Sequence, residues 1–107
     1  MATGRSYLDF VLDGLSGLGG VTYRPMMGEY ILYYRGRIAA YICDDRLLVR
    51  PTPSARALMP HAPEEPPYPG AKPMLLVEEV DDRAFLTALF TAIADELPAR
   101  QAKKKTT

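Results

Sequence analysis

Apolar side chains recur at two different spacings along this chain of 107 residues. Near the N-terminus the spacing is helical, and the apolar stripe consists of Leu8, Val11, Leu12 and Leu15. Ser6 with Asp9 predicts the beginning of this helix, because a hydroxyl and a carboxylate can both serve the orphan amides of a first turn. The glycines within residues 17–20 predict its end.

Residues 23–51 follow the two-residue spacing of strands and are rich in Tyr, Ile, Leu and Val. Three or four short strands are expected, with tight turns at Gly28, Arg35–Gly36 and Asp44–Asp45, because Gly and Asp tolerate a positive φ. Strict alternation places Ile38, Ala40 and Ile42 together on one face. Neither face is cleanly polar, so either both faces are partly covered or one presents tyrosines to solvent or to a partner.

Proline dominates residues 60–73, which contain six prolines in fourteen positions. Few amides there are free to pair, so the segment is predicted to be a loop with an extended, polyproline-like backbone. Its simplest interpretation is a stiff connection over the surface. Because Pro60, Pro63 and Pro66 have the PxxP spacing, the segment is also a candidate ligand for an aromatic groove.

Regular elements are predicted on both sides of this loop. Thr52 and Pro53 predict the cap and first turn of a short helix over residues 54–59. After the loop, residues 74–78 form an apolar run suited to a last strand, and Asp81 or Asp82 can cap a final helix. The apolar stripe of that helix consists of Leu86, Leu89, Phe90, Ile93 and Leu97, and Pro98 ends it.

The order of these elements predicts an α+β fold with a single antiparallel sheet, formed by a strand meander plus one later strand. The N-terminal, short middle and C-terminal helices are expected to pack mainly on one face of that sheet. The domain should span residues 1–98 and be followed by a basic, disordered tail over residues 99–107, which carries Lys103, Lys104 and Lys105.

Composition narrows the class of protein. Hydrophobic residues make up 48% of the chain and charged residues 24%, as in an ordinary globular domain, and the formal net charge of zero gives no whole-chain attraction to nucleic acid or membranes. No apolar run approaches the roughly 20 residues that span a bilayer, so a cytoplasmic location is expected. Cys43 is the only cysteine, which rules out an internal disulfide and agrees with a reducing compartment.

The sequence gives little support to a catalytic function, and no catalytic, metal-binding or cofactor-binding residues are predicted. Cys43 and His61 would be a nucleophile and its base, but Cys43 belongs to an apolar strand, where a thiol is normally inert packing, and His61 lies in the proline segment. Asp44 and Asp45 are expected turn residues. The sequence contains no metal-ligand spacing of His and Cys and no glycine-rich phosphate loop that opens a helix.

Arginines gather in one part of the chain. Residues 24–56 contain six arginines against three acids, for a local formal charge of +3. Next to tyrosines, these residue types suit a surface that contacts phosphates or stacks on bases. The candidate residues are Tyr33, Arg35, Arg37 and Arg50. The alternative is that the arginines are exposed strand residues paired with nearby carboxylates, each pair contributing about 0–1 kcal/mol.

The strand region also resembles a known family. Arg24, Met26, Met27 and Gly28, followed by Gly36 and by residues 45–48, are similar with loose spacing to the Arg-x-Met-Phe-Gly pattern and its downstream Leu, Gly, Ala and Asp positions in the TfoX/Sxy N-terminal domain. Met27 stands where that family commonly has an aromatic residue. The similarity covers roughly residues 5–98. The motif residues themselves are interpreted as structural, with glycines in turns and methionines in packing.

The resemblance implies a bacterial, non-enzymatic regulatory domain, similar to those of natural-competence regulators that act with a cyclic-AMP receptor protein and RNA polymerase. Those longer regulators carry a second, helical domain. Two hypotheses follow: a protein-interaction domain with a partner in the transcription machinery, or a small nucleic-acid-binding module that uses the Arg/Tyr sheet surface. A homodimer through an exposed sheet edge is a further expectation, and no membrane partner is expected.

Overall fold

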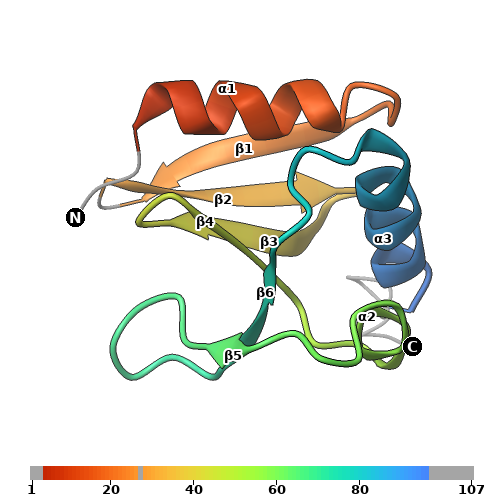
Figure 1. Ribbon diagram of the computed structural model, residues 1–107. Coiled ribbons are helices and arrows are strands. Elements are labelled where there is room, and N and C mark those ends of the chain that lie inside the picture. Colours follow the sequence, from red (N-terminus) through yellow and green to blue (C-terminus); the bar gives the residue numbers. More distant parts are fainter. Residues whose placement is uncertain (1–3, 27, 97–107) are drawn as a thin grey trace, which may run out of the picture.

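The computed structural model describes residues 4–26 and 28–96. Its elements are α1 (Arg5–Gly14), β1 (Val21–Met26), β2 (Glu29–Tyr34), β3 (Arg37–Cys43), β4 (Arg46–Val49), α2 (Pro53–Leu58), β5 (Glu64–Glu65), β6 (Met74–Val77) and α3 (Arg83–Glu96). The strands form one six-stranded antiparallel sheet in the order β1-β2-β3-β4-β6-β5. In Figure 1, β1 and β2 run across the picture while β6 runs down it, as a twisted sheet requires. The predicted α+β fold is confirmed.

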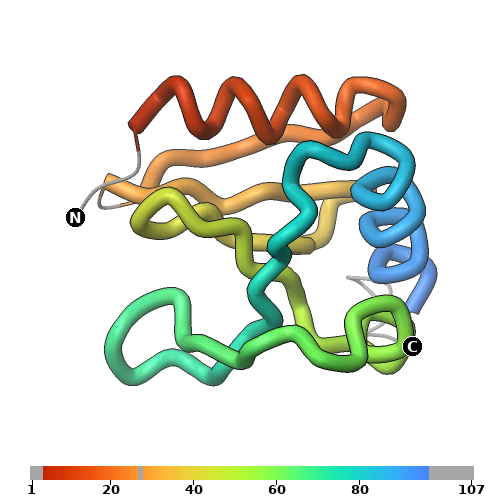
Figure 2. Tube along the Cα trace, in the orientation of Figure 1, coloured from red at the N-terminus to blue at the C-terminus, as the bar shows by residue number. Residues whose placement is uncertain are grey.

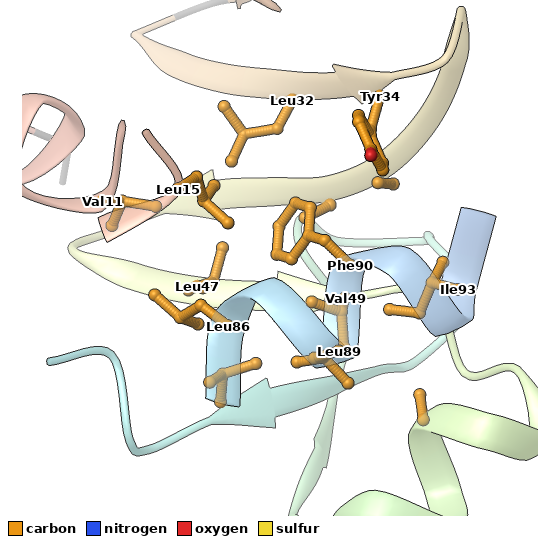
Figure 3. Close-up of a cluster of buried hydrophobic side chains, with 14 of the residues drawn as sticks. Val11, Leu15, Leu32, Tyr34, Leu47, Val49, Leu86, Leu89, Phe90 and Ile93 are labelled. Atoms are coloured by element: carbon orange, nitrogen blue, oxygen red, sulfur yellow. The ribbon is translucent and has the colours of Figure 1, made fainter. Parts of the chain in front are cut away.

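The main hydrophobic core lies on one face of the sheet, beneath α1 and α3. The fully buried side chains there include Leu8 and Val11 of α1, Leu15 directly after it, and Leu86, Leu89, Phe90 and Ile93 of α3. Figure 3 shows Val11, Leu15 and the four side chains of α3 converging with Leu32, Leu47 and Val49 of the strands. The stripes predicted for both helices therefore cover one face of the sheet, as expected. Leu97, Pro98 and the basic tail lie outside the described residues.

Side-chain caps begin α2 and α3. Thr52 Oγ1 accepts a hydrogen bond from the Ala55 N–H at 3.2 Å, and Asp82 Oδ1 accepts one from the Phe85 N–H at 3.0 Å. Each bond satisfies an amide that has no partner within its own helix. The predictions of a cap at Thr52 and of one at Asp81 or Asp82 are confirmed.

The beginning of α1 differs from the expectation. The helix begins at Arg5, after Gly4, and no side chain caps it, so the prediction that Ser6 and Asp9 form its capping pair was wrong. Asp9 instead accepts a hydrogen bond from Arg5 Nε at 3.1 Å, one helical turn away. An exposed pair of this spacing supports a helix only weakly.

Tight turns with positive φ connect the first four strands. Gly28 has a φ of 87°, Arg35 and Gly36 have 56° and 76°, and Asp44 and Asp45 have 55° and 56°. Two successive residues with positive φ give the turn that matches the right-handed twist of paired strands. The Asp44–Asp45 turn achieves this without glycine, because a short polar side chain lowers the cost of the left-handed conformation.

A β-bulge changes the faces of β3. Leu32 pairs with Ala40 but Tyr33 pairs with Ile38, so Ala39 is the extra residue. Ala39 and Ala40 are both fully buried in the main core. The expectation that Ile38 shares a face with Ala40 was therefore wrong, because the bulge turns Ile38 to the face of Tyr33.

The Pro-rich segment is tied to the sheet rather than projecting from it. β5, which was not predicted, pairs with β6, and the Pro63 carbonyl accepts a hydrogen bond from the Leu76 N–H at 2.9 Å. Pro67 is buried. Figure 2 shows the stretch between β5 and β6 as a loop on the side of the molecule away from α1. The rest of the segment is a loop, as predicted, but one that folds back onto its own sheet.

Candidate interaction surface

The open face is the face of the sheet opposite the main core. In the part of the chain that the structure describes, no helix covers it. Pairing across the strands aligns one row of residues on this face: Arg24 opposite Ile31, Ile31 opposite Tyr41, Tyr41 opposite Leu48, and Leu48 opposite Leu76. Directly opposed residues of antiparallel strands point to the same side. The open face therefore presents a band of aliphatic and aromatic side chains that ends in an arginine.

One end of the open face is covered by the Pro-rich loop. A small cluster of Cys43, Leu48 and Met74 is buried there, with Tyr41 and Leu76 packed against it. The Tyr68 ring of the loop lies against the Tyr41 ring, with centroids 6.3 Å apart. Burial, and secondarily Tyr68, raises the pKa of Tyr41 above its usual value. Both alternatives suggested by the sequence thus hold in part, since the face is covered at one end and presents the half-buried Tyr33 away from the loop.

A groove with a volume of about 1000 Å³ lies where the open face meets this loop. One side is lined by the strand residues Met26, Glu29, Cys43 and Arg46 and by Asp44 of the β3–β4 turn, and the other side by Glu65 of β5 and loop residues 66–69. Arg46 forms an ion pair with Glu65, which joins the two sides. Glu29 Oε1 accepts a hydrogen bond from the Asp44 N–H at 3.0 Å, which joins the turn after β3 to the start of β2. The groove is therefore bounded by two hairpin ends and one proline-stiffened wall.

The four residues predicted as a partner or nucleic-acid surface fall into two groups. Tyr33 lies on the open face, and Arg50, which directly follows β4, interacts electrostatically with Tyr41 of that face. Arg35 and Arg37 lie instead at the end of α3. Arg35 forms an ion pair with Asp95 at 2.6 Å, and Arg37 Nη1 donates to the Ala94 carbonyl at 3.2 Å.

Carboxylates engage most of the remaining arginines of this region. Besides the pairs of Arg35 and Arg46, Arg56 forms an ion pair with Glu64 at 2.6 Å. Arg24 and Arg50 have no ion pair with any carboxylate of residues 4–26 and 28–96. The cationic character left on the open face thus comes from Arg24 and Arg50.

Comparison with known proteins identifies the family of this chain. The model of the TfoX N-terminal domain family matches residues 13–95, a span that includes most of α3 and every strand described above. The chain belongs to the TfoX N-terminal domain family. The resemblance predicted from the motif between Arg24 and Leu48 is confirmed, and the family is one of non-catalytic regulatory domains.

A curated relative of this TfoX N-terminal domain has a similar length. It is an uncharacterized 12.7 kDa protein in the trpE 5′ region of Spirochaeta aurantia, with 36% identity over 110 residues that cover 99% of this chain and 96% of the relative. No solved structure matches the chain.

Part of the family motif of this TfoX N-terminal domain lies at one side of the groove. Met26 is part of its lining, Gly28 turns the β1–β2 hairpin, and Arg24 lies further along β1 on the open face. Gly36 turns the next hairpin at the opposite end of β2, and Met27 lies outside the described residues. The motif therefore shapes the hairpin that borders the groove. The loop side of the groove has no counterpart in the motif, and only the folding of residues 65–69 onto the sheet reveals it.

The side chains considered for catalysis are not brought together. Cys43 is buried in the groove lining, where burial and then Glu29 raise the pKa of its thiol to about 11. His61 is exposed and lines a different groove, between the end of α2 and the start of α3. Among the described residues there is no group of His, Cys, Asp and Glu side chains that could hold a metal ion. Within that same part of the TfoX N-terminal domain, the helices are too short or too polar to cross a membrane.

Proposed function

We propose that this TfoX N-terminal domain is a non-enzymatic regulatory domain that binds another protein through its open face. The observation that carries the proposal is the composition of that face. A solvated side of an antiparallel sheet normally carries polar residues, whereas this one carries Tyr33, Ile38, Tyr41 and Leu76, all half-buried. An apolar sheet face of this kind marks a site of protein interaction.

The family supports a partner in the bacterial transcription machinery. The resemblance is to domains of natural-competence regulators, which act with a cyclic-AMP receptor protein and RNA polymerase. We propose the same class of partner here, and with it a cytoplasmic location.

Binding to purified bacterial RNA polymerase and cyclic-AMP receptor protein, measured by biolayer interferometry, tests this proposal. We expect saturable binding to one of them, and its loss in the double variant Tyr33→Ser/Arg50→Ser. The matched control is Phe10→Ser/Arg5→Ser, which removes one aromatic ring and one arginine from the exposed side of α1. Equal loss in the two variants, or binding to neither protein, would contradict the proposal. Light scattering on the same samples measures whether the binding species is the homodimer expected from the sheet edge.

A small nucleic-acid-binding module is the second candidate. The specific observation in its favour is that Arg24 and Arg50, neither of which forms an ion pair with a carboxylate of the described residues, share a face with Tyr33 and Tyr41. Arginines and aromatic rings on a sheet bind single strands through phosphate contacts and base stacking. Fluorescence anisotropy with labelled single-stranded DNA should then show binding that weakens steeply with salt and is reduced by Arg24→Ser and Arg50→Ser. The paired Arg35 provides the control, and an equal effect of Arg35→Ser would argue against this face as the binding surface.

A further inference from the structure

One edge of the sheet is open to a further strand. β1 is outermost in the strand order and pairs only with β2. Among the described residues, no hydrogen bond other than those of the sheet reaches its backbone. The opposite edge strand, β5, has two residues and lies between Pro63 and Pro66, and short length and proline both hinder strand addition. β1 has six residues, so it is the edge that can accept a strand.

Pro25 determines which groups of β1 face outward. Proline has no N–H, so within a sheet it fits where that position points away from the neighbouring strand. Backbone groups of an antiparallel strand alternate between its two sides with a period of two. Tyr23 and Val21 therefore turn their N–H and C=O groups to the free edge. A bound strand can pair with these two residues, and its pairing ends at Pro25.

An apolar groove, called the edge groove below, lies beside the free edge on the face of the sheet along which α1 runs (Figure 1). Leu12 of α1 and Leu18 after it form one side, and Val21 and Tyr23 of β1 form the other. All four side chains are half-buried, and the groove has a volume of about 370 Å³, within the range of ligand pockets. Paired residues of neighbouring strands point to the same face. Residues of a bound strand opposite Val21 and Tyr23 therefore direct their side chains over the edge groove.

Charge on the other face of β1 selects the occupant. Arg24 is exposed on the open face and forms no ion pair with any carboxylate of residues 4–26 and 28–96. Those residues include every Asp and Glu of the chain. A carboxylate of a bound strand beside Arg24 completes a cross-strand pair of opposite charge. A second copy of β1 has no acidic residue and would bring two arginines together, so charge favours a different partner.

We propose that β1 binds an extended segment of a partner protein, which adds to the sheet as a strand. Two apolar side chains, two residues apart, lie over the edge groove, and an acidic residue at an alternate position faces Arg24. This inference rests on the proposed function as a protein-interaction domain and adds the conformation and chemistry of the partner segment. The bound strand continues the sheet and therefore enlarges the open face.

Selection of random short peptides by display on the full chain, followed by affinity measurement with the enriched peptides, tests the inference. The enriched peptides should share two apolar residues with the spacing of a strand and an acidic residue at an alternate position. Methylation of each peptide amide in turn then tests strand pairing. Single methyl groups on alternate amides should weaken binding about tenfold, and those on the intervening amides should change it little, because only alternate amides face β1.

Variants of the chain test the charge. Arg24→Ser removes the cation from the edge and should weaken peptide binding about twofold to fivefold, the range for an exposed ion pair. Arg24→Lys keeps the charge and should retain most of the affinity. The matched control is Arg56→Ser, which removes an exposed arginine from α2 and should leave affinity unchanged.

Three results would overturn the inference. The first is an effect of methylation without a two-residue period, and the second is equal affinity of the Arg24→Ser and Arg56→Ser variants. The third is a dimer of the chain that the peptides convert to a monomer, because it would show that a second copy occupies the edge. If Tyr33→Ser/Arg50→Ser abolishes binding to the transcription proteins but no peptide binds with a two-residue period, the proposed function stands and the edge inference fails. Failure of both measurements would reject both.

Discussion

The ring of Tyr68 packs against the ring of Tyr41 at an interplanar angle of 63°, with centroids 6.3 Å apart. The two residues lie 27 positions apart, one in β3 and the other in the Pro-rich loop. This edge-to-face contact lies beside the buried cluster of Cys43, Leu48 and Met74. It connects the loop to the open face and, with the ion pair of Arg46 and Glu65, gives the groove its second side.

The Tyr41–Tyr68 contact should be measurable as a coupling energy. An aromatic pair of this geometry contributes about 0.5–1.5 kcal/mol beyond the area that it buries. A double-mutant cycle with Tyr41→Ala and Tyr68→Ala, followed by urea denaturation, should give a coupling of this size. Tyr68→Phe keeps the ring and should retain most of it. Additive single effects would show that the loop is held by other contacts.

Substitution of Gly14 by alanine is expected to destabilise the folded chain. A Cβ on Gly14 would lie 3.0 Å from Cδ1 of Leu86. Leu86 is fully buried where α1 and α3 meet. Overpacking of this kind costs about 1–3 kcal/mol, more than the roughly 1 kcal/mol of helix propensity that alanine supplies within a helix. Gly14→Ala should therefore lower the free energy of unfolding by about 1 kcal/mol.

The control for Gly14 is Gly17→Ala. A Cβ on Gly17 would lie 4.0 Å from Thr87 Oγ1, an ordinary van der Waals distance. Thermal and urea unfolding should show little change for this variant. A loss as large as that of Gly14→Ala would contradict the steric explanation.

Arg37 should matter more to stability than Arg35, although both were predicted to face a partner. Arg37 Nη1 donates to the Ala94 carbonyl near the end of α3, and its buried Nε has no hydrogen-bond partner among the described residues. Arg37→Ala removes this hydrogen bond to the Ala94 carbonyl and should cost about 1–3 kcal/mol. Arg35→Ala breaks an exposed ion pair and should cost clearly less. The reverse order in urea denaturation would show that the end of α3 is held differently.

The Cys43 thiol should make stability depend on pH in the alkaline range. Its pKa rises from an ordinary value of 9.0 to about 11 in the folded chain, chiefly because the thiol is buried. The folded chain therefore holds this proton more tightly than the unfolded chain, so the contribution is complete below pH 9.0 and is lost as pH rises toward about 11. The difference in unfolding free energy between the natural chain and Cys43→Ala should narrow across this window.

Alkylation provides a second measurement of the same property. The thiolate is the reactive form, so Cys43 should react slowly with iodoacetamide near neutral pH and much faster in denaturant. Fast reaction of the folded chain would contradict the burial of the thiol. In the unfolding measurement, a difference in unfolding free energy from Cys43→Ala that does not change with pH would contradict the raised pKa.

Local chemistry determined most of the fold. The helical stripes of α1 and α3, the cap at Thr52, the three turns and the family motif are short-range features, because propensity, capping and turn preference act over only a few residues. They were sufficient to predict one antiparallel sheet with its helices on one face. The candidate surface was predicted only in part, since Tyr33 and Arg50 belong to the open face whereas Arg35 and Arg37 contact α3.

Tertiary structure decided the rest. The bulge at Ala39 depends on how β3 pairs with β2, and a one-residue change of register exchanges the faces of a strand. β5 and the groove depend on the folding of the Pro-rich loop onto β6 and Tyr41. Such contacts join residues far apart in sequence, and no local pattern encodes their partner. The sequence by itself determined the elements and the family, and packing alone determined which of their side chains meet.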